Sequence, residues 1–255
     1  MPLPVLIRRV NKLCIDIQDA VVMRRRKVAL DTVTFSVRCG EFVGVIGPNG
    51  AGKTTLLMLI NGLVQARKGR VRVLESTPHF ANGFLLRRQI GYVAQVERID
   101  PRLPITVRDT VAAGCYGRLG WLKRMQKADW RRVSDALGWV GAAHLAERPV
   151  GCLSGGEYQR VAIARVLTQQ PRVFLFDEPT ASIDPQAQRD ILALIQRIHS
   201  EMGATTLYVT HNLDTLPETC GRLVLMRQGT IWREGRPDEM LAPKLVEQLY
   251  LGERA

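Results

Sequence analysis

The chain has 255 residues, of which 46% are hydrophobic and 24% are charged, the balance of a globular protein and not of a disordered one. No apolar run approaches the roughly 18–20 residues that span a bilayer, and the N-terminus lacks a signal-peptide pattern, so we expect a cytosolic protein. The formal net charge of +12 is compatible with a nucleic acid partner, an anionic membrane surface or merely a solvated surface, but no basic stripe interleaved with aromatic residues accompanies it.

The cysteines do not form a metal-binding pattern. There are five of them, an odd number, and they stand far apart in the chain. The histidines do not supplement them at zinc-site spacings. We therefore expect reduced, mostly structural thiols at Cys14, Cys39, Cys115, Cys152 and Cys220.

The N-terminal third has the pattern of strands followed by one helix. Residues 13–17 and 33–37 alternate apolar and polar side chains, which predicts half-buried strands of an antiparallel sheet. Residues 42–46 are uniformly apolar and predict a buried strand, followed by a Gly-rich turn and a helix over about 53–63. A further short strand is expected at 71–74.

The middle of the chain has a different residue pattern. Prolines at 101 and 104 precede apolar residues at helical spacing, which indicates a helical insert within an α/β domain. After residue 154 the α/β alternation returns. The expected elements are a helix to about 169, a strand at 173–176, a helix at 186–202 ended by Gly203, a strand at 206–210 and a hairpin at 222–228 and 230–233.

A phosphate-binding loop joins the 42–46 strand to the following helix. Its pattern, G-x-x-x-x-G-K-[ST], lets backbone N–H groups surround an anion at a helix N-terminus. Lys53 would reach the β- and γ-phosphates of a nucleotide, and the Thr54 hydroxyl would ligate Mg²⁺. The predicted ATP-binding residues of this loop are Gly47, Pro48, Asn49, Gly50, Ala51, Gly52, Lys53, Thr54 and Thr55.

Two consecutive carboxylates end the 173–176 strand. Asp177 would hold the magnesium ion, directly or through water. Glu178 follows immediately, where its carboxylate can polarise the water that attacks the γ-phosphorus. We therefore predict Asp177 as a metal residue and Glu178 as the catalytic base.

A second candidate anion site precedes that strand. In Leu153-Ser154-Gly155-Gly156-Glu157, Ser154 is a helix N-cap, the glycines expose backbone N–H groups, and Glu157 completes a capping box. A well-capped helix alone would also use Ser and Glu here. Together with the phosphate loop and the carboxylate pair, however, the segment resembles the signature motif of the ABC (ATP-binding cassette) ATPases. Ser154, Gly155, Gly156 and Glu157 are accordingly predicted to bind ATP.

Three further positions match the ABC family in order along the chain. Gln95 resembles the glutamine that senses magnesium and the attacking water, Ser182-Ile183-Asp184 resembles the loop that reaches across a dimer, and His211 resembles the histidine that contacts the γ-phosphate. The resemblance covers nearly the whole chain. It implies ATP and Mg²⁺ as cofactors, catalytic roles for Lys53, Gln95, Glu178 and His211, and magnesium contacts from Thr54, Gln95 and Asp177.

The resemblance also implies a fold and an assembly. The expected fold is a P-loop NTPase core with a mixed parallel sheet, an N-terminal antiparallel β subdomain and an α-helical insert. In this division residues 1–95 and 160–255 form the nucleotide-binding core, and 96–159 form the helical subdomain. ATP would be held in a head-to-tail homodimer between one copy's phosphate loop and the other's signature motif, so that binding closes the pair and hydrolysis reopens it.

The sequence departs from the family at the adenine site. ABC cassettes usually stack an early aromatic residue on the base, but the corresponding place near Met23 or Arg24 holds none. The Arg24 guanidinium is able to stack on a base. The choice between ATP and GTP is therefore left open by the sequence.

The helical insert resembles one class of ABC ATPases more specifically than the rest of the chain does. Residues 104–109 and 114–121 look like the insert of ATPases that serve bacterial zinc and manganese importers, with the iron-chelate class close by. This predicts separate transmembrane permease subunits, an indirect solute-binding protein and a place at the cytoplasmic face of the inner membrane, with no nucleic acid partner. The alternative is a soluble ABC ATPase acting on nucleic acid or ribosomes, which only the basic charge supports.

Overall fold

The computed structural model describes residues 12–78, 83–95, 100, 102, 104–119 and 123–251. The chain begins with a three-stranded antiparallel sheet in the order β2-β1-β4. Its strands are β1 (Leu13–Arg24), β2 (Lys27–Arg38) and β4 (Lys68–Val73), and the first two extend well beyond the predicted segments. Apolar and polar side chains alternate between the core and solvent along all three strands, as expected for a sheet with one buried face.

The central sheet has six strands in the order β5-β6-β7-β3-β8-β9. Neighbouring strands from β5 to β8 are parallel, and β9 is antiparallel to β8 across the predicted hairpin. Strands β3, β6 and β7 are buried along their whole length, which explains the apolar runs of β3 and β6. The strands are β3 (Phe42–Ile46), β5 (Ile90–Val93), β6 (Val173–Asp177), β7 (Thr205–Thr210), β8 (Arg222–Arg227) and β9 (Thr230–Gly235).

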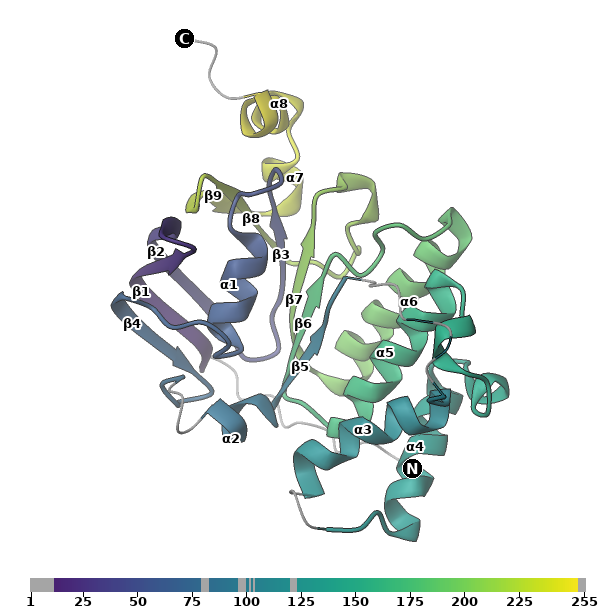
Figure 1. The fold of residues 1–255 in the computed structure, drawn as a ribbon. Coiled ribbons are helices and arrows are strands. Elements are labelled where there is room, and N and C mark those ends of the chain that lie inside the picture. Colours follow the sequence, from purple (N-terminus) through teal and green to yellow (C-terminus); the bar gives the residue numbers. More distant parts are fainter. Residues whose placement is uncertain are drawn as a thin grey trace.

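Helices cover both faces of the central sheet. Figure 1 shows α1 (Lys53–Ile60) between the two sheets, with α5 (Gly155–Gln169) and α6 (Pro185–Met202) on the opposite face. One apolar core lies on each face of the central sheet. Asp184 caps the start of α6 through the backbone N–H groups of residues 186 and 187, and Gly203 ends the helix with a left-handed φ of 59°. These features confirm the predicted α/β fold.

Two helices of the predicted insert, α3 (Val107–Leu119) and α4 (Lys127–Trp139), pack against α5 (Figure 1). Asp129, which is almost fully buried on α4, accepts hydrogen bonds from Arg118 at 2.7 Å and Arg132 at 2.9 Å. The proposed boundary at residues 159 and 160 falls inside α5, which is one continuous helix. Gly120 and Trp121 of the segment compared with metal-importer ATPases lie outside the described residues.

The remaining described helices are short. They are α2 (Gly83–Arg87), η1 (Ala143–Leu145), η2 (Val150–Cys152), η3 (Leu213–Thr215), α7 (Pro237–Met240) and α8 (Pro243–Leu251). Helices α7 and α8 follow the closing hairpin and were not predicted. Across the described residues, no helix combines the length and hydrophobicity needed to span a bilayer.

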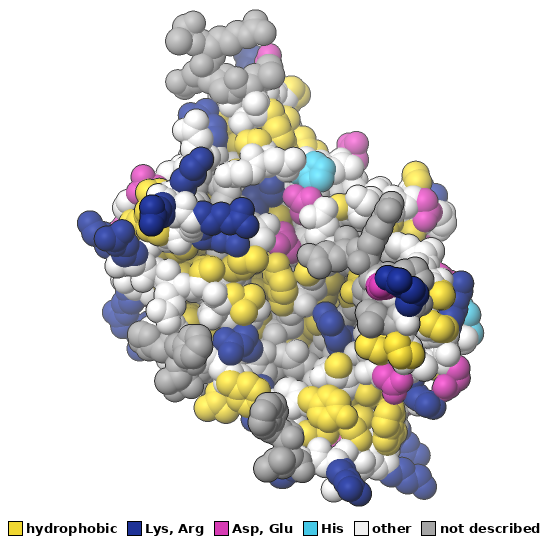
Figure 2. Space-filling view, in the orientation of Figure 1, with side chains coloured by type: hydrophobic (Ala, Val, Ile, Leu, Met, Phe, Trp, Pro, Cys, Tyr) yellow, Lys and Arg dark blue, Asp and Glu magenta, His cyan; other side chains and the backbone are white. Residues whose placement is uncertain are grey.

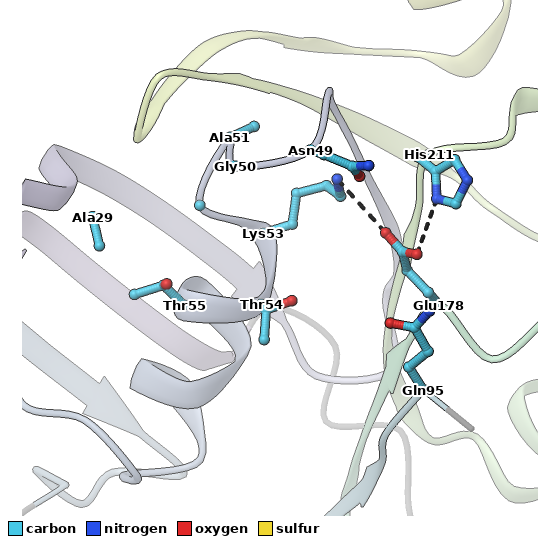
Figure 3. A pocket seen from close by; sticks show the side chains of 11 residues that line it. Ala29, Asn49, Gly50, Ala51, Lys53, Thr54, Thr55, Gln95, Glu178 and His211 are labelled. Carbon is cyan, nitrogen blue, oxygen red and sulfur yellow. Dashed lines mark hydrogen bonds and ion pairs between the residues drawn. The ribbon is translucent and has the colours of Figure 1, made fainter. Parts of the chain in front are cut away.

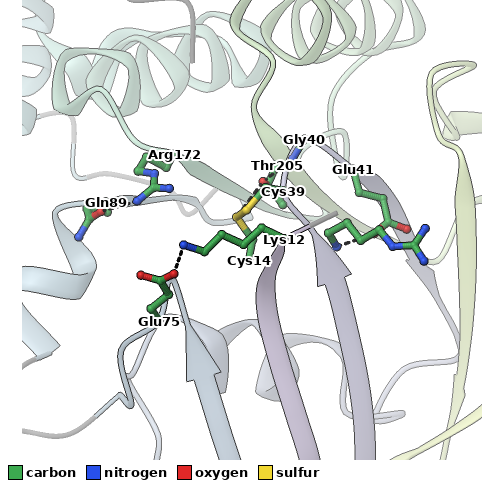
Figure 4. Close-up of a disulfide and its surroundings, with 10 residues drawn as sticks. Lys12, Cys14, Cys39, Gly40, Glu41, Glu75, Gln89, Arg172 and Thr205 are labelled. Carbon is green, nitrogen blue, oxygen red and sulfur yellow. Dashed lines mark hydrogen bonds and ion pairs between the residues drawn. A yellow bond between two sulfur atoms is a disulfide. The ribbon is translucent and has the colours of Figure 1, made fainter. Parts of the chain in front are cut away.

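One sequence prediction is wrong. Cys14 and Cys39, expected as reduced thiols, form a disulfide (Figure 4). They are 25 residues apart in the chain, but the pairing of Leu13 with Arg38 in β1 and β2 brings the Cα atoms to 4.9 Å, within bridging range. Of the other cysteines, Cys115 and Cys220 are buried free thiols and Cys152 is exposed.

Candidate functional site

The phosphate loop connects β3 to α1, as predicted. The N-cap of α1 is Gly52, with a φ of 100°, a left-handed backbone that ordinary side chains adopt only with strain. Gly47 packs so close to β8 that a Cβ on it would clash with the carbonyl oxygen of Met226. These two glycines let the loop curl tightly against the edge of the sheet, with the N-terminus of α1 directed at the enclosed space.

Lys53 lies inside the curl of the loop. Its side chain is 5% exposed, and its Nζ donates to the carbonyl oxygens of Gly47 at 2.7 Å and Pro48 at 3.1 Å. Burial lowers the pKa of Lys53, an effect opposed by the charges of Glu178 and Asp177. The ammonium group is therefore held by the loop's own carbonyls, next to the place where a phosphate would lie.

The predicted magnesium residues meet where β6 ends. Thr54 Oγ1 donates to Asp177 Oδ1 at 3.2 Å, although 123 residues separate them in the chain. Burial raises the pKa of Asp177, while hydrogen bonds from Tyr92, at 2.8 Å, and from Thr54 act in the opposite direction. A hydroxyl beside a carboxylate is the hard oxygen set that Mg²⁺ prefers, so the residues present fit the ion.

Glu178 occupies the centre of the site. Its Oε2 lies 2.9 Å from His211 Nδ1, and its Oε1 lies 3.8 Å from Lys53 Nζ (Figure 3). The residue has a φ of 49°, an uncommon backbone for a non-glycine, and its N–H donates to the carbonyl of Val209 at 3.0 Å. The turn after β6 thus directs the carboxylate across the sheet edge, toward the residue that follows β7.

These side chains surround a cavity of about 460 Å³, a size typical of sites for small ligands. A second cavity of about 200 Å³ shares Gln95, Glu178 and His211 and extends toward Ser182 of the predicted dimer loop. Gln95 therefore lies where the sequence places it (Figure 3). The first cavity is lined by Ala29, Asn49, Gly50, Ala51, Gly52, Lys53, Thr54, Thr55, Gln95, Glu178 and His211.

The signature-like segment is not among the residues that line either cavity. Ser154 and Glu157 form the predicted capping box at the start of α5: the Ser154 N–H donates to Glu157 Oε2 at 2.7 Å, and the Glu157 N–H donates to Ser154 Oγ at 3.3 Å. The hydrogen bond from the Ser154 backbone lowers the pKa of Glu157. A Cβ on Gly155 would clash with Ile183, so the segment packs against the predicted dimer loop.

Two residues near the site were missed by sequence reasoning. Ala29, from β2, lines the cavity, whereas neither Met23 nor Arg24 does, so stacking by Arg24 on a base stays a hypothesis. Tyr92 reaches Asp177 from β5, the strand that leads to Gln95. No motif indicated Tyr92, because its role depends on β5 and β6 being neighbours in the sheet.

Comparisons with known proteins decide between the nucleotide-binding families that share such a loop. The family model described as ABC transporter matches residues 30–181. The chain belongs to the ABC transporter family. As a member it is an ATPase subunit whose ATP hydrolysis is coupled to transport.

Individual ABC relatives match most of the chain. A manganese transport system ATP-binding protein, MntB, of Listeria innocua is 37% identical over 239 residues, which cover 94% of this chain and 93% of the relative. A probable metal transport system ATP-binding protein of Thermotoga maritima is 35% identical over 221 residues, covering 87% and 83%. Among solved structures, the dimeric post-hydrolysis state of the cassette MJ0796, bound to ADP and phosphate, superposes with a TM-score of 0.77 at 26% identity, covering 88% and 98%.

Proposed function

We propose that the cavity holds Mg-ATP and that Glu178 is the base of its hydrolysis. The observation that carries the proposal is the Glu178 carboxylate, fixed between Lys53 and His211 at a cavity lined by the phosphate loop. Backbone N–H groups of residues 49–54 and the Lys53 ammonium would bind the phosphates. Magnesium, held by Thr54 and Asp177 with Gln95 beside it, supplies charge neutralisation of the β- and γ-phosphates when bound.

The other side chains have roles that follow from their positions. The Glu178 carboxylate would orient the attacking water and accept its proton, since it is 15% exposed and therefore partly screened from bulk solvent. His211 holds the second carboxylate oxygen of Glu178 and lies beside the γ-phosphate position. Lys53, already desolvated, would exchange its carbonyl partners for phosphate oxygens.

The proposal includes a head-to-tail homodimer. Ser154, Gly155 and Gly156 form the N-terminus of α5 and line neither of the two cavities described above, so we assign them to a nucleotide bound by another copy. The dimeric relative supports this arrangement. ATP binding would close the pair across both sites, and hydrolysis would reopen it.

We further propose that separate membrane subunits dock beside the helical insert. Phe84 and Leu85 on α2 and Tyr116 on α3 are 50%, 60% and 52% exposed. Figure 2 shows apolar side chains gathered on the lower part of this face, over the α2 and α3 region. Residues 96–159 would form the helical subdomain and 1–95 and 160–255 the nucleotide-binding core, so the docking surface would combine α3 of the subdomain with α2 of the core. Docking there would place the protein at the cytoplasmic face of the membrane.

The proposed cargo is a metal ion or metal chelate taken up by the membrane subunits. The support is the names of the relatives from Listeria and Thermotoga, which match most of the chain at 37% and 35% identity. A solute-binding protein would deliver the cargo to the membrane subunits and would not contact this chain.

The Glu178→Gln variant tests the hydrolytic role. We expect ATP hydrolysis to fall by a factor of about 10²–10⁴, because the base is removed while the shape of the side chain is kept. ATP binding should persist, and the variant should accumulate as an ATP-bound dimer in size-exclusion chromatography. Hydrolysis at the wild-type rate would remove Glu178 as the base.

The Ser154→Arg variant tests the shared site. A long side chain there should block ATP-driven dimerisation while ATP still binds the monomer. Ser154→Ala is the matched control, because it loses the same N-cap, at a cost of about 1 kcal/mol, but leaves room for the partner's nucleotide. Equal dimerisation of both variants would contradict the shared site.

Co-purification tests the transport partner. The chain should pellet with membranes and elute with a membrane subunit, and Phe84→Asp with Leu85→Asp should weaken that capture without lowering basal hydrolysis. Capture of ribosomes or nucleic acid instead would support the soluble alternative and overturn the docking proposal.

A further inference from the structure

The C-terminal helix α8 lies against the same end of the central sheet as the candidate site. Figure 1 shows it beyond α7 and the end of β8, at the top of the view. Leu249 is 1% exposed and belongs to the core that also contains α5 and α6. Arg227 Nη1, at the end of β8, donates to the Gln248 carbonyl at 3.5 Å. The helix is therefore anchored by a buried apolar side chain and by a contact to a central strand.

Next to this anchor, Tyr250 reaches the segment of residues 210–215 at the end of β7, which we call the switch segment. Its hydroxyl donates to the backbone carbonyl of His211 at 2.9 Å, across 39 residues of sequence. His211 is the residue whose imidazole holds Glu178 at 2.9 Å. A single side chain on α8 thus binds the main chain of a residue whose ring touches the proposed base.

The rest of the switch segment is held by hydrogen bonds to the Asn212 carbonyl, and not to that of His211. Thr210 Oγ1 and Thr215 Oγ1 both donate to the carbonyl of Asn212, at 3.1 Å and 2.9 Å. Within the described part of the chain, the hydrogen bond from Tyr250 is the one found on the His211 carbonyl. Since the His211 side chain is 47% exposed, packing alone does not fix its position.

A surface tyrosine bound to a carbonyl is often only a helix-docking contact. Here Leu249 and Arg227 already dock α8, whereas the Tyr250 bond ends at the catalytic edge of the sheet. Burial and the nearby charge of Glu178 raise the pKa of Tyr250, so its hydroxyl stays protonated and able to donate.

We propose that Tyr250 is a positioning residue for hydrolysis, which holds the main chain of His211 so that the imidazole remains against the Glu178 carboxylate. The inference rests on the proposed roles of Glu178 and His211. It makes α8 part of the hydrolytic site, although no residue of α8 lines the cavity. Movement of the C-terminal helix would then change the rate of hydrolysis without changing the affinity for ATP.

The test is the Tyr250→Phe variant of the full chain, compared with the wild type in steady-state hydrolysis of Mg-ATP. Phenylalanine keeps the ring and removes only the donor. We expect kcat to fall roughly threefold to tenfold, the usual scale for one lost hydrogen bond, with KM for ATP within about twofold. An unchanged kcat, or a raised KM at constant kcat, would overturn the proposal.

Two further measurements separate positioning through His211 from a merely structural role. In the first, single-turnover hydrolysis of radiolabelled ATP is measured in His211→Ala and in the double variant His211→Ala, Tyr250→Phe. Adding Tyr250→Phe to His211→Ala should cause no further loss of the hydrolysis rate. The same fold loss in both backgrounds would show that Tyr250 acts elsewhere. Hydrogen exchange in Tyr250→Phe should rise in the peptide over residues 205–216, and unchanged exchange there would contradict the proposal.

The Glu178→Gln and His211→Ala variants, measured in the same assay, separate failure of the Tyr250 proposal from failure of the proposed function. If both lose hydrolysis and Tyr250→Phe does not, only the positioning role of Tyr250 fails. If Glu178→Gln hydrolyses ATP like the wild type, the proposed function itself fails, whatever Tyr250→Phe does.

Discussion

The crossing of α3 over α5 depends on a glycine at the point of contact. A Cβ added at Gly114 would lie closer than 3.0 Å to the backbone carbonyl oxygen of Arg165 and to the hydroxyl of Thr168. The single proton of the Thr168 hydroxyl is shared between the carbonyl of Arg165 on its own helix, at 2.7 Å, and the carbonyl of Val111 on α3, at 3.2 Å; the latter hydrogen bond joins the two helices. Gly114→Ala must therefore push the helices apart where this hydrogen bond bridges them.

The magnitude of the effect follows from three contributions. Overpacking against backbone costs about 1–3 kcal/mol, and weakening the buried Thr168 bonds costs about 1–3 kcal/mol more. Replacing a helical glycine by alanine returns about 1 kcal/mol. We expect Gly114→Ala to lower the free energy of unfolding by about 1–5 kcal/mol, which at roughly 3 °C per kcal/mol corresponds to a loss of roughly 3–15 °C in Tm.

Gly117 provides a control on the same helix. An added Cβ there meets no atom within 4 Å, so Gly117→Ala should stabilise the protein by about 0.5–1 kcal/mol through helix propensity. The assay is urea unfolding followed by circular dichroism, with the shift in midpoint compared between the two variants. Effects of the same sign and size would refute the reasoning that close approach of α3 and α5 requires glycine at 114.

Two further predictions concern single side chains. Tyr92→Phe removes the hydroxyl that donates to Asp177 at 2.8 Å. The Mg²⁺ concentration for half-maximal hydrolysis should therefore rise roughly tenfold. An unchanged magnesium dependence would count against this role of Tyr92. Alkylation of the native protein at pH 8, mapped by mass spectrometry, should modify the exposed Cys152 and spare Cys220. The reason is that burial raises the pKa of Cys220 to about 11. Equal labelling of both cysteines would contradict the burial of Cys220.

The parts of the fold that could be predicted from the sequence are those that depend on short stretches of consecutive residues. The phosphate loop, the capping box at Ser154 and the glycine at 203 each depend on a few consecutive residues. Strand alternation and buried apolar runs likewise predicted both sheets. Strand lengths were less accurate, because the extension of β1 and β2 is fixed by pairing between them and not by their own composition.

The unpredicted contacts at the disulfide and at the site depend on which segments become neighbours. The Cys14–Cys39 disulfide follows from the register of β1 and β2, and Tyr92 meets Asp177 because β5 lies beside β6. Ala29 lines the cavity because β2 packs over the phosphate loop, where Gly52 approaches the Ala29 carbonyl. Such contacts join residues far apart in the chain and leave no periodic or motif signal.

The measurement that tests the account most directly is a structure of Glu178→Gln with ATP and Mg²⁺. The account predicts two copies of the chain, with each ATP between the phosphate loop of one copy and residues 154–156 of the other. Magnesium should lie against Thr54 and Asp177, and residue 178 should face the γ-phosphate. ATP bound within one copy alone, or held away from Lys53, would contradict the account.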